Sequence, residues 1–143
     1  MNAPEPAVHP AEPEQRWSDV TATLEPQRRD ALIAALTSIL PVGALLSRTE
    51  QTRPYECDGL TAYRQRPMCV VLPETEAQVQ AVLRTCQRLG VPVVARGAGT
   101  GLSGGAMPHA QGVTLSLAKF NKILKMDVHS RTAVVQCGVR NLA

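Results

Sequence analysis

Aromatic side chains are scarce in this sequence of 143 residues, which holds one Trp, two Tyr and one Phe. Apolar residues nevertheless make up 44% of the chain, which is enough to build a core. That core must therefore consist mainly of Val, Leu, Ile and Ala side chains. The length suits one domain or a part of a larger one.

Long apolar runs and cysteine pairs are missing as well. No stretch approaches the roughly 18 consecutive apolar residues of a membrane span, and the N-terminus lacks the apolar region of a secretion signal. The cysteines are far apart, without a C-x-x-C pair: Cys57, Cys69, Cys86 and Cys137. This usage is typical of a reduced cytoplasmic protein with free thiols.

The sequence also has no block of one charge sign. Its net charge is +3, and the basic residues are dispersed along the chain. A strongly basic patch is the usual footprint of nucleic-acid binding, so this balance argues against that class of function. We assign no metal site.

The N-terminal third predicts an arm followed by a helix. Prolines among Ala and Glu over residues 1–16 indicate a disordered arm. We assign residues 17–47 to a helical segment whose helix runs over 27–40 and ends at Pro41 and Gly43. Its apolar positions recur at helical spacing: Ala31, Leu32, Ala35, Leu36 and Ile39. Residues 44–46 predict a short strand, and the polar stretch 48–66 a surface loop.

The middle of the chain predicts a β-α-β unit. Residues 68–72 form an apolar strand, and Thr75 with Gln78 forms a capping box that begins a helix. Gly90 ends the helix before the next strand over 91–95, so the two strands lie parallel in one sheet. The predicted apolar face of the helix comprises Val79, Val82, Leu83, Cys86 and Leu89. Further strands are predicted over residues 113–117, 123–126 and 132–136, the last two joined by a turn.

The second predicted strand runs into a loop with five glycines between Gly97 and Gly105. Bare backbone of this kind lets successive N–H groups point at one anion, as in a diphosphate cradle. A P-loop would need a lysine, and none lies between Met68 and Pro108. A Rossmann fingerprint would need a different spacing of the third glycine and an acidic residue about 20 positions later. A glycine-rich connection that binds nothing remains an alternative.

Four segments carry a family resemblance: RPYECDGL at 53–60, PVVARGAGTGLSGGA at 92–106, FNKIL at 120–124 and VQCGVRNLA at 135–143. With them, the chain from about Leu45 onward resembles the FAD-binding domain of the FAD-linked oxidase superfamily. This is the vanillyl-alcohol-oxidase type, also called the p-cresol-methylhydroxylase (PCMH) type. Within it the likeness is greatest to the FAD-binding subunits of bacterial glycolate oxidases.

The resemblance implies an α+β fold, with residues 48–143 as the first part of the FAD-binding domain. This part is the first subdomain, a β-α-β unit with a small mixed sheet. Members of the superfamily are about three times longer, so the second subdomain and the substrate cap are expected beyond this chain.

The resemblance also implies the cofactor and its contacts. Residues of the glycine loop would wrap the FAD diphosphate: Arg96, Gly97, Ala98, Gly99, Thr100, Gly101, Gly104 and Gly105. Arg96 either adds charge to that site or packs at the end of its strand. Some relatives attach FAD covalently through a histidine in this loop, where this chain has Thr100. Noncovalent FAD is therefore expected, and Cys137 is expected to be a small buried apolar residue.

The implied activity is oxidation of a small 2-hydroxy acid, glycolate to glyoxylate first of all. Electrons would pass to an iron–sulfur partner subunit, which could also hold the protein at the inner membrane. D-lactate or D-2-hydroxyglutarate is the alternative substrate, and a non-catalytic interaction module is the alternative function. We assign no catalytic residue, and we expect the 143-residue chain alone to be inactive.

Overall fold

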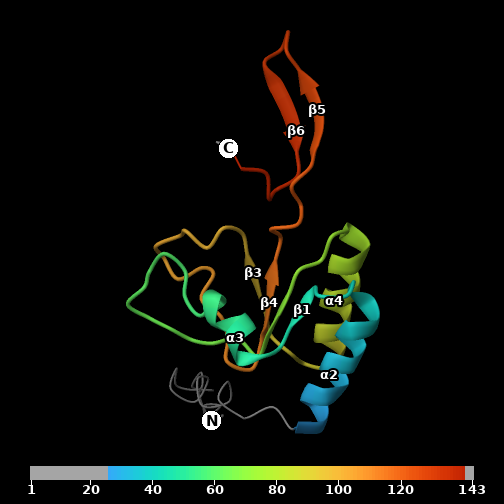
Figure 1. Cartoon of the computed structure of the whole chain (residues 1–143), viewed down its shortest axis with the longest axis vertical. Helices are drawn as coiled ribbons and strands as arrows, with labels where there is room; N and C mark the ends of the chain where they lie inside the picture. Colours follow the sequence, from blue (N-terminus) through green and yellow to red (C-terminus); the bar gives the residue numbers. More distant parts are fainter. Residues whose placement is uncertain (1–25, 141–143) are drawn as a thin grey trace, which may run out of the picture.

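A computed structural model describes residues 26–140, in which a four-stranded sheet carries helices on one side (Figure 1). The sheet order is β1-β2-β4-β3, from β1 (Leu45–Leu46), β2 (Cys69–Val71), β4 (Val113–Ser116) and β3 (Val93–Arg96). β2 and β3 both run parallel to β4, whereas β1 is antiparallel to β2. The small mixed sheet and the parallel β-α-β strands are thus confirmed, with β4 lying between the two strands of that unit. The predicted arm over 1–16, and residues 141–143, lie outside the described residues.

Helix α2 (Pro26–Ile39) and helix α4 (Glu76–Arg88) pack together on one face of the sheet (Figure 1). This arrangement confirms both predicted helices. One core cluster joins side chains of both helices to alternate residues of the central strands: Leu32, Leu36, Val82, Cys86, Cys69, Val71, Val113 and Leu115. The core is aliphatic, as the scarcity of aromatic residues predicted.

The ends of α4 follow the predicted caps. The Thr75 hydroxyl accepts from the Gln78 amide at 3.2 Å, while the Gln78 side chain accepts from the Thr75 amide. At the other end Gly90 adopts a φ of +62°, and the Val91 amide donates to the Cys86 carbonyl at 2.9 Å. This is a Schellman motif, in which glycine avoids the strain that a side chain would meet in the left-handed region.

The predicted apolar face of α4 is wrong at one position. Leu83 is 45% exposed, whereas Thr85 is buried beside Val82 and Cys86. The buried face is therefore turned toward Thr85, on a helix that packs against α2 as well as the sheet. A threonine methyl group gives no strong apolar signal in the sequence, so the pattern favoured Leu83.

The expected loop over residues 48–66 contains short helices. α3 (Thr49–Thr52) is followed by a 3-10 turn, η2 (Arg53–Tyr55). These irregular segments lie on the side of the sheet away from α2 and α4 (Figure 1). Both faces of the central strands are covered, because Thr114 and Ser116 of β4 are as buried as Val113 and Leu115.

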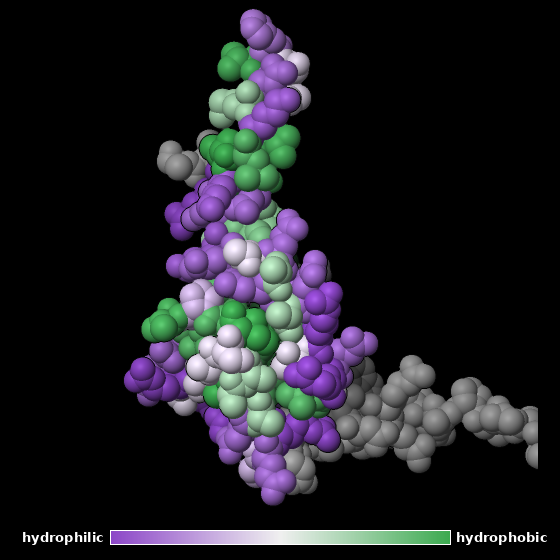
Figure 2. Space-filling model, turned by 90° about the vertical axis from the view of Figure 1, so that its right-hand side faces the viewer, coloured by the Kyte–Doolittle hydropathy of each residue, from purple (hydrophilic) through white to green (hydrophobic). Residues whose placement is uncertain are grey.

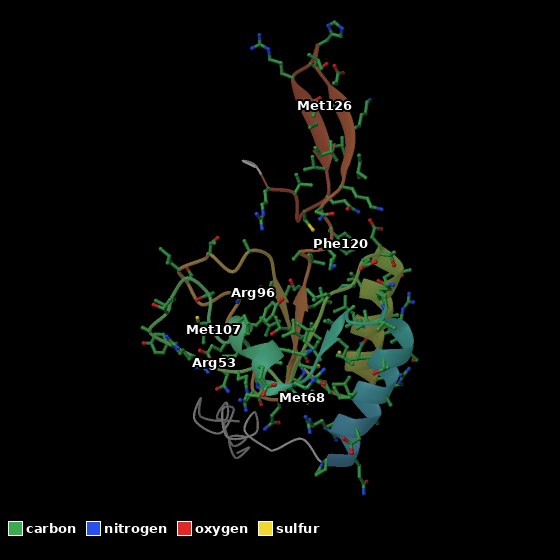
Figure 3. The ribbon with its side chains drawn as sticks, in the orientation of Figure 1. Arg53, Met68, Arg96, Met107, Phe120 and Met126 are labelled. Carbon is green, nitrogen blue, oxygen red and sulfur yellow. The ribbon has the colours of Figure 1, made fainter. Side chains whose placement is uncertain are left out.

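Strands β5 (Ile123–Asp127) and β6 (Thr132–Val135) form the predicted antiparallel hairpin. The hairpin projects from the sheet and its helices (Figure 1), and all residues of β6 are exposed. Phe120 lies where the chain passes from the sheet to the hairpin (Figure 3). Among residues 26–140, no helix has the length and apolar character needed to cross a membrane.

Candidate functional site

The glycine loop leaves the carboxyl end of β3, which is an edge strand of the sheet. None of the amide N–H groups of residues 97–106 donates a hydrogen bond to another residue of the described chain. Most of these residues are exposed. A run of amides without protein partners is the arrangement that an anion can bind through several parallel hydrogen bonds.

Two of the glycines hold backbone conformations that other residues avoid. Gly99 and Gly104 both have a φ of +72°. A Cβ atom at Gly99 would also collide with the guanidinium of Arg96. In contrast, a Cβ at Gly97, Gly101 or Gly105 would meet nothing within 4 Å. These three positions therefore have open space that a ligand can fill.

The loop rests on the turn at Asp58–Gly59. A Cβ at Gly59 would lie 2.7 Å from the Thr100 carbonyl oxygen and 2.8 Å from that of Gly101. Only glycine allows this approach. The turn is itself fixed, because the buried Asp58 carboxylate accepts from the Leu60 amide at 2.9 Å. The carbonyl side of Thr100 and Gly101 thus faces the protein.

Arg96 joins the loop to the same support. Its Nη1 donates to the Cys57 carbonyl at 2.7 Å, and its guanidinium carbon lies 5.5 Å from the centroid of the Tyr55 ring. Arg96 lies in the body of the protein, on the loop side of the sheet (Figure 3). Arg96 was expected either to add charge to the site or to pack at the end of its strand. These contacts support the packing role.

A cleft of about 560 Å³ lies between the start of the glycine loop and the chain that leaves the hairpin. This volume is typical of small-molecule sites. Its residues are Gly97, Ala98, Leu117, Ala118, Cys137, Gly138, Val139 and Arg140. One wall offers free amides and the others offer mostly small or apolar groups, so the cleft suits a ligand with an anionic and an apolar part.

The structure brings only some of the predicted site residues to this cleft. Gly97 and Ala98 line it, whereas Arg96, Gly99, Thr100, Gly101, Gly104 and Gly105 do not. Gly104 instead begins a turn, in which its carbonyl accepts from the Met107 amide at 3.0 Å. The loop therefore extends past the cleft, with its amides still free.

Residues 137–140 form the opposite wall and were not predicted as site residues. The glycine at position 138 was the signal in the sequence. The structure explains it, because a Cβ there would lie 2.6 Å from the Leu117 carbonyl oxygen. Its amide donates to the Phe120 carbonyl at 2.7 Å, which fixes this wall against the body. Cys137 is exposed in the cleft, so the expectation of a buried thiol was wrong.

The titratable groups of the described chain suggest no acid–base pair in the cleft. The buried thiols are those of Cys69, whose pKa burial raises to about 12, and Cys86, whose pKa burial raises to about 11. Both lie in the core. His109 accepts from the Gln111 amide through Nδ1 at 3.1 Å, in a loop turn. All four cysteines are free, as predicted.

Comparison with known proteins agrees with this geometry. The family described as FAD binding domain matches residues 67–143. Glycolate oxidase subunit GlcD of Escherichia coli (strain K12) is 54% identical over 115 residues, covering 80% of this chain and 23% of that protein. D-2-hydroxyglutarate dehydrogenase of Xanthomonas citri pv. viticola is 34% identical and covers 77% of this chain and 23% of that protein.

Among solved structures, p-cresol methylhydroxylase with substrate bound superposes with a TM-score of 0.72 at 26% identity. The match covers 81% of this chain and 23% of that one. This chain thus spans about a quarter of the length of the relatives it matches. By the family match and by its fold, the chain belongs to the FAD-binding domain family of PCMH-type flavoproteins.

Proposed function

We propose that this chain is the FAD-binding part of a flavoprotein that oxidises a small 2-hydroxy acid, with glycolate, converted to glyoxylate, as the favoured substrate. The observation that carries the proposal is the run of free amides at residues 97–106 beside a cleft with apolar walls. The name of the 54% identical relative, a glycolate oxidase subunit, supports the choice of substrate.

The residues present fit FAD. The amides of Gly97 and Ala98 would hold the diphosphate at the cleft, and those of Gly99, Thr100, Gly101, Gly104 and Gly105 would extend the same surface. Oriented amides can replace the water that a diphosphate loses on binding, without a lysine. Bound FAD would supply the acceptor for two electrons and a proton. Attachment would be noncovalent, since no histidine lies between Arg53 and Met107.

Catalytic groups are assigned to parts of a longer polypeptide. Oxidation of a 2-hydroxy acid needs a base for the hydroxyl proton and a cation for the carboxylate. Among residues 26–140, the cleft has only Cys137 and Arg140 as ionisable side chains. This chain would therefore bind the cofactor and place it, while the base would come from outside the described residues.

Several finer points belong to the same proposal. Residues 48–143 would be the first part of the FAD-binding domain, preceded by the helical segment 17–47 and an arm over 1–16. Electrons would leave through an iron–sulfur partner subunit, in the cytoplasm or at the inner membrane. The name of the relative as a subunit supports the existence of a partner.

D-lactate and D-2-hydroxyglutarate are the alternative substrates. Relatives named for both acids match this chain, at 41% identity over 70 residues and 34% over 110 residues. A module that binds no cofactor is the other alternative. Flavin binding separates that module from the enzyme part, because FAD fluorescence is quenched on binding.

The first experiment titrates FAD with the 143-residue chain and follows flavin fluorescence. We expect weak saturable binding and no glycolate turnover. Gly97→Val should abolish binding, because its side chain would enter the open space at the cleft. The matched control is Ala133→Val on the exposed strand β6. Equal FAD binding by both variants would contradict the proposal that the glycine loop holds the diphosphate. Rapid glycolate turnover by the 143-residue chain would contradict its proposed inactivity.

A further inference from the structure

Among residues 26–140, the cleft is lined by one cationic side chain, that of Arg140, and by no acidic residue. Arg140 is exposed and makes no ion pair with another residue of the described chain. An arginine without a protein partner, facing a cleft with free amides, is available to a ligand anion.

The cationic side chain on the loop side, that of Arg96, has its contacts elsewhere. Arg96 donates to the Cys57 carbonyl, stacks near Tyr55 and does not line the cleft. The loop thus brings N–H dipoles to the cleft and no full positive charge. A diphosphate carries about two negative charges, and burying them in such a site is costly without an opposite charge nearby.

We propose that Arg140 is a binding residue that supplies this charge to the phosphates of the bound dinucleotide, from the wall opposite the glycine loop. The inference rests on the proposed function and adds a residue to the same site. A guanidinium suits the role, because it can donate two parallel hydrogen bonds to phosphate oxygens.

The backbone before Arg140 is held in position for this role. The Gly138 amide donates to the Phe120 carbonyl at 2.7 Å, and the Val139 amide donates to the Gln136 carbonyl at 3.1 Å. A Cβ at Gly138 would overlap the Leu117 and Phe120 carbonyl oxygens at 2.6 and 2.8 Å. Arg140 therefore lies two residues after Gly138, whose backbone is fixed against Leu117 and Phe120.

The test compares Arg140→Gln with Arg131→Gln in the 143-residue chain. Arg131 likewise forms no ion pair within the described part of the chain, but it lies in the hairpin turn outside the cleft. Titrations with FAD and with riboflavin, which has no phosphate, are followed by flavin fluorescence. We expect Arg140→Gln to weaken FAD binding about tenfold, as for loss of a charge-assisted hydrogen bond. Arg131→Gln should change it less than twofold, and Arg140→Lys should recover part of the loss.

The salt dependence gives a second measurement. FAD binding by the unsubstituted chain should weaken as salt rises, and Arg140→Gln should reduce that dependence, because a screened charge pair is lost. FAD binding by Arg140→Gln that equals that of the unsubstituted chain would overturn the inference and leave the proposed function standing. So would an equal loss for riboflavin. An unsubstituted chain that binds no FAD would overturn both.

Discussion

The central strands of the four-stranded sheet and the strands of the β5–β6 hairpin all contain apolar residues, yet the two regions differ in burial. Every residue of β2 and β4 is buried, whereas every residue of β6 is exposed. The difference lies in what covers them: α2, α4 and the irregular segments enclose the sheet, and the hairpin projects alone (Figures 1 and 2). Strand sequence predicts strands, but burial depends on neighbours.

The hairpin nevertheless has an apolar face. Ile123 pairs with Val135 and Met126 pairs with Ala133, while a register irregularity at Leu124 keeps these pairs on one face. Ile123, Met126 and Val135 are 57%, 64% and 44% exposed. Figure 2 shows apolar side chains exposed on the projecting part. The cleft lies where this hairpin joins the sheet, so the candidate site depends on both regions.

The largest expected effect contrasts the two regions directly. Leu36→Ala removes a side chain with 0% exposure from the core and should lower the free energy of unfolding by about 2–5 kcal/mol. Met126→Ala removes a side chain that is 64% exposed and should change the free energy of unfolding by less than about 0.5 kcal/mol. Urea unfolding followed by circular dichroism measures both. Similar losses would mean that the hairpin is covered in solution.

An intermediate effect is expected under the glycine loop. Gly59→Ala forces the Thr100 and Gly101 carbonyls away, and such overpacking costs about 1–3 kcal/mol. Gly101→Ala adds the same methyl group on the open side and should cost less than about 1 kcal/mol. Both should weaken FAD binding, the first by moving the loop and the second by obstructing it. Full stability in Gly59→Ala would show that the loop does not rest on this turn.

The last expected effect concerns pH. The pKa values of Cys69 and Cys86 rise from 9.0 to about 12 and about 11 because burial disfavours their thiolates. Above pH 9 the unfolded chain therefore releases protons that the folded chain keeps, so stability falls as pH rises from 9 toward 11–12. The urea midpoint under reducing conditions should drop between pH 8 and pH 10. The drop should be smaller in Cys69→Ala, and an equal drop in both would exclude this cause.

Much of the body was predictable because local signals determine it. Thr75 with Gln78 fixed the start of α4, and Gly90 fixed its end. The glycine density at 97–105 also predicts an anion site from the backbone freedom of the residue itself, and that site stays a prediction. The hairpin turn at 127–131 was also readable from sequence.

The contacts between distant segments were not predictable. Nothing in the pattern of Arg96 shows that Cys57 would accept its hydrogen bond, and nothing in Thr100 shows that Gly59 lies beneath it. The exposure of Cys137 and the cleft position of Arg140 likewise depend on how the hairpin leaves the sheet. Such outcomes follow from packing between elements, which single-residue preferences do not contain.

The attachment of the glycine loop to residues 57–59 sets the smallest piece of this chain that can retain flavin. The family match begins at residue 67, which is after residues 57–59. A shortened polypeptide starting there would keep β2, α4, β3 and β4 but would have neither Cys57 for the guanidinium of Arg96 nor Gly59 beneath the loop. A minimal flavin-binding fragment should therefore begin before Cys57.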